Sequence, residues 1–337
     1  MKINFFGDVM LGRGVANIIS DDQNLLLDFK KTENNDSINI CNLEAPIIIN
    51  EPIKKNKFYV SKNALPMLGF FHGVSIANNH ICDQGEIGII NTVEVLKQRG
   101  IKYTGAGINK EEAFLPIIIR EDKYNIIILG LTSINNISAS DRNLAEKIAL
   151  IEDKSFIDEF IMKYNNPMNI LVAMPHMGVE HVDAPTNYIV NKYRSLVDMG
   201  FDAIIGSHPH TVQGVEWYKK GLICYSLGDF IFDNLNKLRR KSLIVNLDFK
   251  TPNEWEARFR LSIKNEEFIP KLQSSEITEK YLKRVNRFIG NKYFYGSRFI
   301  SGKLYNQIYT IYSETKFNGF KGLIKVILSK LRLFLSR

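Results

Sequence analysis

Short, continuously apolar runs recur along the first 230 residues, and helical patterns separate several of them. Asn125–Leu129 and Asn169–Ala173 are two such runs, and Lys154–Tyr164 between them has the spacing of an amphipathic helix. Strands that are apolar on both faces are typical of sheets covered by helices on each side. This alternation predicts an α/β fold and constrains the chain more than any other feature of its sequence.

The pattern changes after Asp233, where strand-like segments follow one another without helices between them. In the first part we expect strands at Lys2–Phe6, Ile38–Cys41, Val74–Ala77, Ile117–Ile119, Asn125–Leu129, Asn169–Ala173, Ala203–Ile205 and Leu222–Tyr225. We expect helices at Gly88–Arg99, Lys154–Tyr164 and Asn187–Asp198, and antiparallel strands at Ser242–Phe249, Trp255–Ile263 and Phe268–Leu272. The polar stretch Asn135–Asn143 is predicted to be a surface loop.

The cysteines and the N-terminus indicate an intracellular protein. The chain has three scattered cysteines, an odd number that provides no disulfide framework and favours a reducing compartment. Asp8 interrupts the N-terminal apolar run before a signal peptide could form, and no segment approaches the roughly 20 apolar residues of a membrane-spanning helix. We therefore expect a cytoplasmic location.

The basic charge belongs to the C-terminal part. Residues 280–337 hold 13 Lys and Arg and a single acid, whereas the other 279 residues have a net charge of −4. Within this part, Phe320–Arg337 has apolar residues at helical spacing and cations mainly on the opposite side. Such a helix suits the anionic inner face of a membrane, although packing on the body is the alternative. No nucleic-acid recognition motif is present, so we do not expect nucleic-acid binding. We expect a main domain at 1–275 and a basic, aromatic-rich helical tail at 276–337.

Polar residues follow the predicted strands at the points where those strands end. They include Asp8, Asn42, Glu44, Asn78, Asn79, His80, Asp83, His176, His208, His210 and Asp229. Ligand sites in α/β domains gather at the carboxyl ends of strands. Each motif alone is compatible with an ordinary turn, but four of the six histidines stand in these loops. Carboxylate, amide and imidazole groups together suit a divalent ion such as Mn, Fe or Zn, and the lack of thiolates argues against a structural zinc site.

The order of these motifs resembles a known family. Gly-Asp, Asn-Leu-Glu, Asn-Asn-His-x-x-Asp-x-Gly, His-x-Gly-x-Glu, Gly-x-His-Pro-His and Tyr-Ser-Leu-Gly occur in the order seen in the bacterial capsule-synthesis CapA family. That family is linked to poly-γ-glutamate capsules and belongs to the calcineurin-like metallophosphoesterase superfamily. The resemblance covers about residues 1–250. It implies a four-layer α/β/β/α sandwich with two divalent metal ions.

The resemblance also implies a role for each motif residue. The implied metal ligands are Asp8 for the first ion, Glu44 as the bridging carboxylate, Asn79, His176 and His208 for the second ion, and His210 for the first. His80 would be the general acid, or would neutralise a transition-state oxyanion, and Asp83 would orient its ring. Further positions would support the ligands or hold substrate, namely Asn42, Asn78, Arg13, Glu180, Ser226 and Asp229. Arg13 is alternatively a surface cation and Glu180 a helix-start residue.

Two departures bear on the activity. Met10 stands where classical phosphoesterases have a histidine, and Asp229 stands where the family commonly has Asn. The expected function is metal-dependent, phosphoesterase-like hydrolysis in capsule or cell-surface polymer biosynthesis, on a phosphoester or anionic polymer. One alternative is a non-catalytic assembly factor that binds an anionic polymer or a lipid-linked intermediate. Another is a γ-glutamyl amide hydrolase or transferase.

Overall fold

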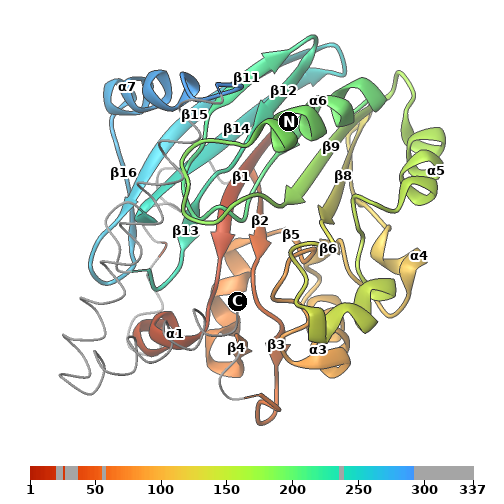
Figure 1. Ribbon diagram of the computed structural model, residues 1–337, viewed down its shortest axis with the longest axis vertical. Helices are drawn as coiled ribbons and strands as arrows, with labels where there is room; N and C mark the ends of the chain where they lie inside the picture. The colour runs from red at the N-terminus through yellow and green to blue at the C-terminus, as the bar shows by residue number, and fades with distance from the viewer. Residues whose placement is uncertain (20–25, 27–36, 55–57, 235–238, 292–337) are drawn as a thin grey trace, which may run out of the picture.

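The chain folds into two β-sheets that lie face to face, with helices on the outer face of each (Figure 1). The computed structural model describes residues 1–19, 26, 37–54, 58–234 and 239–291. Within these residues the layers follow the order helix, sheet, sheet, helix, so the predicted four-layer α/β/β/α sandwich is confirmed. The amphipathic helix predicted at 320–337 lies outside the described residues.

The first sheet carries the N-terminus of the chain. Its strand order in the described part of the chain is β16-β15-β14-β1-β2-β5-β6, and β13 also pairs with β1. The strands β1, β2, β5 and β6 are parallel, whereas β14, β15 and β16 add antiparallel pairs. The bounds are β1 Lys2–Val9, β2 Ser37–Leu43, β5 Gly73–Ser75, β6 Lys102–Thr104, β13 Asp229–Ile231, β14 Lys241–Thr251, β15 Glu254–Lys264 and β16 Pro270–Leu272.

The second sheet has the order β11-β12-β10-β9-β8-β7. Its four inner strands are parallel, and its two edge strands pair antiparallel. The bounds are β7 Ile117–Arg120, β8 Asn125–Thr132, β9 Asn169–His176, β10 Ala203–Ile205, β11 Val215–Tyr218 and β12 Gly221–Cys224, and a separate short pair joins β3 Ile47–Ile48 to β4 Val60–Ser61.

Three apolar cores hold the layers together. Phe5 and Ile40 of the first sheet pack with Ile128 and Val172 of the second in the core between the sheets. A second core lies under α1, η1 and α3, and a third lies under α4, α5 and α6. The helical bounds are α1 Arg13–Ile19, η1 Lys62–Phe70, α3 Gly85–Gln98, α4 Lys110–Ala113, η2 Ala139–Lys147, α5 Lys154–Tyr164, α6 Asn187–Met199 and α7 Ser275–Asn286. Because strands such as β1 are buried on both faces, they are apolar along most of their length.

The predicted loop at Asn135–Asn143 is partly wrong, because a 3-10 helix, η2, begins at Ala139. Ser138 donates to Asp141 at its start, and Lys110 donates to the carbonyl oxygens of Ala145 and Ile148 near its end. These tertiary hydrogen bonds satisfy a polar segment that has too few apolar residues to indicate a helix from its sequence.

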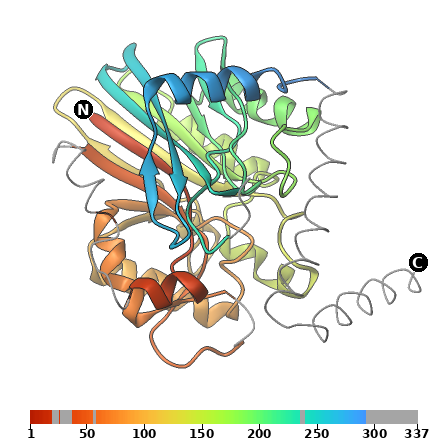
Figure 2. The ribbon, with the colours of Figure 1, turned by 90° about the vertical axis from the view of Figure 1, so that its left-hand side faces the viewer.

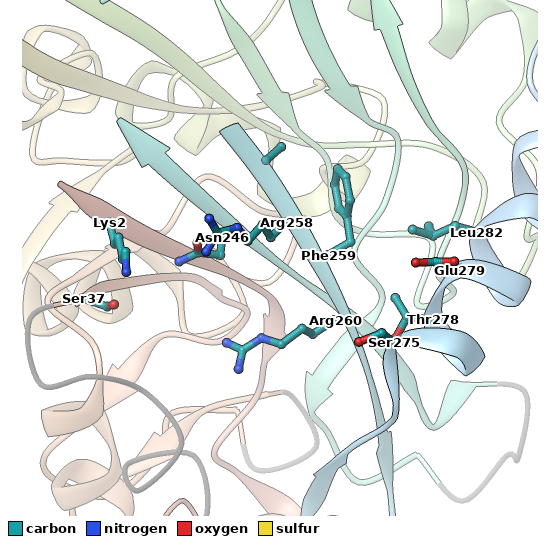
Figure 3. Close-up of a pocket in the computed structure, with 11 residues that line it drawn as sticks. Lys2, Ser37, Asn246, Arg258, Phe259, Arg260, Ser275, Thr278, Glu279 and Leu282 are labelled. Carbon is teal, nitrogen blue, oxygen red and sulfur yellow. The ribbon is translucent and has the colours of Figure 1, made fainter. Parts of the chain in front are cut away.

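Helix α7 packs on β15 and β11 (Figure 2). Val285 and Phe288 form a small core there with Val182 and Ala184. A cavity of about 580 Å³ lies between this helix and the amino end of β1, and Lys2, Arg258 and Arg260 line it (Figure 3). It is at the opposite end of β1 from Asp8. None of the described helices is both long and apolar enough to cross a lipid bilayer.

Candidate metal centre

Parallel strands of both sheets end at the same place in the molecule. The arrowheads of β1 and β2 in the first sheet and of β8 and β9 in the second point in the same direction (Figure 1). Asp8 and Asn42 lie near the carboxyl ends of β1 and β2, and His176 is the last residue of β9. The face-to-face packing of the sheets therefore brings the motif residues of distant segments together.

Glu44 stands at the middle of the cluster, with imidazole rings close to its carboxylate. Its side chain is fully buried, and neither carboxylate oxygen has a hydrogen-bond partner among the described residues. Three imidazoles nevertheless surround its Oε1, with Nε2 of His210 at 3.5 Å, Nε2 of His176 at 3.8 Å and Nε2 of His80 at 3.8 Å. A buried carboxylate without a partner is costly, so this arrangement is suited to a cation.

Asp8 is held by donors on both of its oxygens. Asn42 donates to Oδ1 at 2.8 Å, and the backbone N–H of His208 donates to Oδ2 at 3.2 Å. Asn42 is itself held by the amide of Asn78, which donates to its Oδ1 at 3.2 Å and to the carbonyl oxygen of Leu43 at 2.8 Å. The predicted supporting residues Asn42 and Asn78 thus form a chain of amides behind Asp8.

His176 links several predicted ligands. Its Nε2 lies 2.8 Å from Oδ1 of Asn79 and 3.1 Å from Nδ1 of His208. On the other side of the ring, Nδ1 lies 2.9 Å from Oγ of Ser207 and 3.1 Å from the amide nitrogen of Asn42. The three residues that the sequence assigned to one metal ion are therefore in direct contact.

The ring of His80 is in contact with the carboxylate of Asp83. Nδ1 of His80 lies 2.8 Å from Oδ2 of Asp83, and the same oxygen accepts a hydrogen bond from the backbone N–H of Phe58. The Phe58 ring stacks on the His80 ring with centroids 4.1 Å apart. Since Asp83 faces Nδ1, the other nitrogen, Nε2, is directed at the cluster.

His210 has a carboxylate partner of its own. Its Nδ1 lies 2.8 Å from Oδ1 of Asp229, and Nζ of Lys264 lies 3.6 Å from the other oxygen of Asp229. Asp229 and Lys264 are both buried. Asp229, which was predicted to support the site, is thus next to His210, a predicted metal ligand. The sequence did not indicate that Lys264 would be its partner.

Burial and mutual repulsion disfavour charge on the two central carboxyl groups. Burial raises the pKa of Asp8 to about 6, although His210 and the hydrogen bonds from Asn42 and His208 act in the opposite direction. Burial, together with the charges of Asp8 and Asp229, raises the pKa of Glu44 well above its usual range. Burial alone would also raise the pKa of Asp229, but Lys264 and His210 outweigh it, so the pKa of Asp229 is lowered.

The imidazoles are divided into two kinds. Burial lowers the pKa of His208 to about 3, and it lowers the pKa of His176 as well, with neighbouring histidines adding to the effect. Burial also opposes protonation of His210, but Asp229 and Asp8 outweigh it and raise the pKa of His210. Neutral imidazoles are the form that binds metal ions.

The backbone of the cluster adopts an uncommon conformation. His181, His208 and His210 have φ angles of 69°, 95° and 56°, a left-handed region that non-glycine residues seldom occupy. Residues of this kind cost on the order of 1–3 kcal/mol each and concentrate at functional sites. The strained backbone at His208 and His210 is thus the conformation in which both imidazole rings face the cluster.

Three predicted residues lie outside the inner cluster. Arg13 donates from Nε to Asp233 at 3.0 Å, and its guanidinium carbon lies 4.3 Å from the Phe58 ring centroid. Glu180 is partly exposed and lies 3.3 Å from His181. The hydroxyl of Ser226 accepts a hydrogen bond from the N–H of Gly228 and so shapes the turn before β13.

Met10 does not face the cluster as a ligand. Its sulfur accepts a hydrogen bond from the N–H of Gly12 at 3.1 Å. Sequence reasoning missed four residues that complete the surroundings of the site. Ser207 is the variable position of Gly-x-His-Pro-His, and its place inside that motif was the available signal, whereas Phe58, Asp233 and Lys264 belong to no motif. These four residues contact His176, Arg13, His80 and Asp229, respectively.

The donors present fit a divalent cation. In the described part of the chain, Asp8, Glu44 and His176 offer ligand atoms within 4.8 Å of one another, and so do Asp8, His210 and Asp229. All five side chains are buried. However, Oδ1 of Asp229 already bonds His210, and its Oδ2, although without a hydrogen bond, lies 3.6 Å from the cationic Nζ of Lys264, whereas no described Lys or Arg pairs with Glu44. The set around Glu44 is therefore the better match.

The fold and the cluster define an α/β sandwich with a candidate metal centre between its two sheets. The chain belongs to the bacterial capsule synthesis protein PGA_cap family, whose model matches residues 2–234. This confirms the CapA-family resemblance. The chain is 28% identical over 258 residues to the capsule biosynthesis protein CapA of Bacillus anthracis, covering 69% of this chain and 60% of the relative. It is 25% identical over 272 residues to the PGA biosynthesis protein CapA of Bacillus subtilis (strain 168), covering 74% and 68%.

Solved structures show weaker similarity. A hypothetical protein from Thermus thermophilus has a TM-score of 0.47 at 11% identity, covering 77% of this chain and 98% of that one. The NAD nucleotidase of Haemophilus influenzae has a TM-score of 0.42 at 13% identity, covering 86% and 56%. Both scores are below 0.5, so the architecture rests on the strands and helices of this chain.

Proposed function

We propose that this chain is a metal-dependent hydrolase of the phosphoesterase type that acts in the biosynthesis of a capsule or another cell-surface polymer. The observation that carries the proposal is Glu44, a buried carboxylate without a hydrogen-bond partner among the described residues, with three imidazoles within 3.8 Å of its Oε1. The family membership supports the polymer pathway. The substrate class is an anionic polymer or a phosphoester.

Asp8, Glu44, Asn79, His176, His208 and His210 would hold the divalent ions. Such ions, two of them in the fullest form of the proposal, supply charge neutralisation and an activated water. Asp83 keeps a proton on Nδ1 of His80, so Nε2 of His80 is free to hold or give a proton on the side of the cluster. The stacked Phe58 ring excludes water from one face of His80 and limits its rotation.

The test is metal content together with turnover. Purified protein, metal-stripped and then reconstituted with Mn²⁺, is analysed for bound metal and assayed on bis(p-nitrophenyl) phosphate and on a γ-glutamyl peptide. We expect wild type to bind Mn²⁺ and cleave the phosphodiester, and His208→Ala to lose both. His72→Ala is the matched control, because His72 lies at the other end of the sheets, where its Nδ1 accepts from the N–H of Asn39.

A second candidate is a non-catalytic assembly factor, and Met10 is the observation that favours it. Met10 stands where classical phosphoesterases have a histidine for the first metal position, and its sulfur is engaged by the N–H of Gly12. Metal binding without turnover on either probe would favour this candidate. Cleavage of the γ-glutamyl peptide alone would favour amide hydrolysis.

Contact with an anionic membrane through residues 320–337 is a separate proposal that rests on the sequence. It is tested by flotation of the full chain and of a chain lacking 320–337 with vesicles that contain phosphatidylglycerol. Equal flotation of the full chain and the chain lacking 320–337 would contradict this proposal.

A further inference from the structure

A buried lysine stands behind the candidate metal centre. Lys264 is the last residue of β15, and only 2% of its surface is exposed. Its Nζ has no hydrogen-bond partner in the described part of the chain, and the carboxylate of Asp229 is 3.6 Å away. Lysine is almost never buried in this way unless its charge is paired. The pairing with Asp229 is therefore the reason for its position.

Asp229 is shared between two neighbours. Oδ1 lies 2.8 Å from Nδ1 of His210, and Oδ2 faces Lys264. Nε2 of His210 is then 3.5 Å from Oε1 of Glu44. A continuous line of polar contacts thus runs from β15 through Asp229 and His210 to the middle of the cluster.

This arrangement decides which nitrogen of His210 faces the cluster. A carboxylate only accepts hydrogen bonds, so Asp229 keeps the proton on Nδ1 and leaves the lone pair on Nε2. A carboxylate that is buried next to a metal-ligand histidine typically orients that ring. Asp229 itself needs a compensating charge, because removing one member of a buried ion pair leaves the other uncompensated. Lys264 supplies that charge.

We propose that Lys264 is a positioning residue of the metal centre, which holds Asp229 so that His210 presents Nε2 to Glu44. The role of Lys264 at a metal centre rests on the proposed function, whereas the contacts that join Lys264, Asp229 and His210 are observed in the structure. Lys264 lies beyond residues 2–234, which the family model matches. The antiparallel hairpin of β14 and β15 is therefore more than a cover for the sandwich, because it completes the site.

The first experiment reads the His210 ring directly. Long-range ¹H–¹⁵N spectra of the full, metal-free chain, recorded at a pH above the raised pKa of His210 so that the ring is neutral, report the tautomer of each histidine, and His210→Gln identifies the signal. We expect the Nδ1–H form in wild type and a mixture, or the other form, in Lys264→Met. Lys110→Met is the matched control, because it breaks another partly buried ion pair, with Asp153 at 2.7 Å, outside the cluster. It should leave the His210 signal unchanged.

The second experiment measures Mn²⁺ affinity by calorimetry. Lys264→Met should weaken binding by about 10- to 100-fold, the usual effect of losing a partner behind a metal ligand. Lys264→Arg keeps the positive charge and should stay within a few-fold of wild type. If Lys264→Met does not fold, Lys264→Arg and the double variant Asp229→Asn/Lys264→Met carry the test. The double variant removes both charges and should show the mixed tautomer.

An unchanged His210 tautomer in the Lys264→Met or double variant overturns the proposal, as does loss of the Nδ1–H form in Lys264→Arg. The proposed function can fail separately. A changed tautomer in a chain that binds no Mn²⁺ in any variant would support the positioning role and contradict the metal centre.

Discussion

Nε2 of His176 lies 2.8 Å from Oδ1 of Asn79, so two predicted ligands of one metal ion hydrogen-bond to each other. The amide oxygen accepts, so Nε2 is the donor. The contact also joins the two sheets, because His176 ends β9 of the second sheet and Asn79 follows β5 of the first. It keeps both atoms close to the positions in which a cation would find them.

Removing the amide of Asn79 tests this contact. We expect Asn79→Leu to lower Mn²⁺ affinity by at least the roughly 10- to 100-fold typical of a lost partner around a metal. Calorimetric titration of the metal-stripped protein measures the change. Asn136→Leu is the control, because the side chain of Asn136 donates to the backbone carbonyl of His176 and not to its ring. Equal affinities of the two variants would contradict the assignment of Asn79 as a ligand.

Asp8 makes the stability of the metal-free chain depend on pH. Burial raises the pKa of Asp8 in the folded state from its ordinary value of 3.8 to about 6, so the folded state holds the proton more tightly. The resulting destabilisation is absent below pH 3.8 and grows as the pH rises to about 6. It amounts to about 3 kcal/mol at pH 7, since one pKa unit corresponds to 1.36 kcal/mol.

The matching experiment compares wild type with Asp8→Asn by urea unfolding without metal. The variant has no carboxyl group at position 8 to ionise, so its stability relative to wild type should rise by about 2 kcal/mol between pH 4 and pH 7, because part of the effect is already present at pH 4. Any constant cost of the substitution cancels in this comparison. A difference that does not vary with pH would show that Asp8 is not held in the buried, desolvated environment described above.

Substitution of His80 should lower turnover without lowering metal content, unlike substitution of a predicted metal ligand. We expect His80→Asn to reduce turnover of the phosphodiester probe by about 100- to 10,000-fold, the usual contribution of a positioned acid or base. Metal content should stay at the wild-type level, because the contacts of Asp8, Asn79 and His176 are unchanged. Asp83→Asn should give a smaller loss in turnover. A His80→Asn protein that loses its metal would identify His80 as a ligand instead.

The first strand leaves no room for a side chain beside Gly228. A Cβ at Gly7 would meet the carbonyl oxygen of Gly228 at 1.9 Å, and that oxygen also accepts from the N–H of Asp8 at 2.9 Å. Gly7→Ala should therefore cost at least about 3 kcal/mol of unfolding free energy, the upper end of what overpacking costs, and displace Asp8. Gly69→Ala, where a Cβ meets nothing within 4 Å, should stay within about 0.5 kcal/mol. Urea unfolding at one pH compares the two.

The inner strands and the predicted metal ligands at their ends could both be recognised in the sequence, because both follow from burial of these strands on two faces. Such a strand is mostly apolar along its length, so polar residues such as Asp8 and His176 mark its carboxyl end. Strands β6 and β11 were missed because their residues are partly exposed and include polar side chains, so they form no continuous apolar run. Lys264 was missed for another reason. It ends a strand whose residues alternate in burial, where a lysine is ordinarily assumed to face water.

The pairing of Arg13 also needed the fold. Its partner Asp233 is 220 residues away, and no local pattern joins them. From the sequence alone, Arg13 could either contact substrate or be a surface cation. The structure shows a cation already bound to a carboxylate at the edge of the site.

The ligands of the candidate centre come from two sheets that share no backbone hydrogen bonds within the described strands. Asp8 belongs to one sheet, and His176 to the other. An ion held by both would cross-link them, so a slip of one sheet along the other would change its coordination distances. The rate of metal exchange would then report on sliding of one sheet along the other, and any partner that displaces one sheet would weaken binding of the ion.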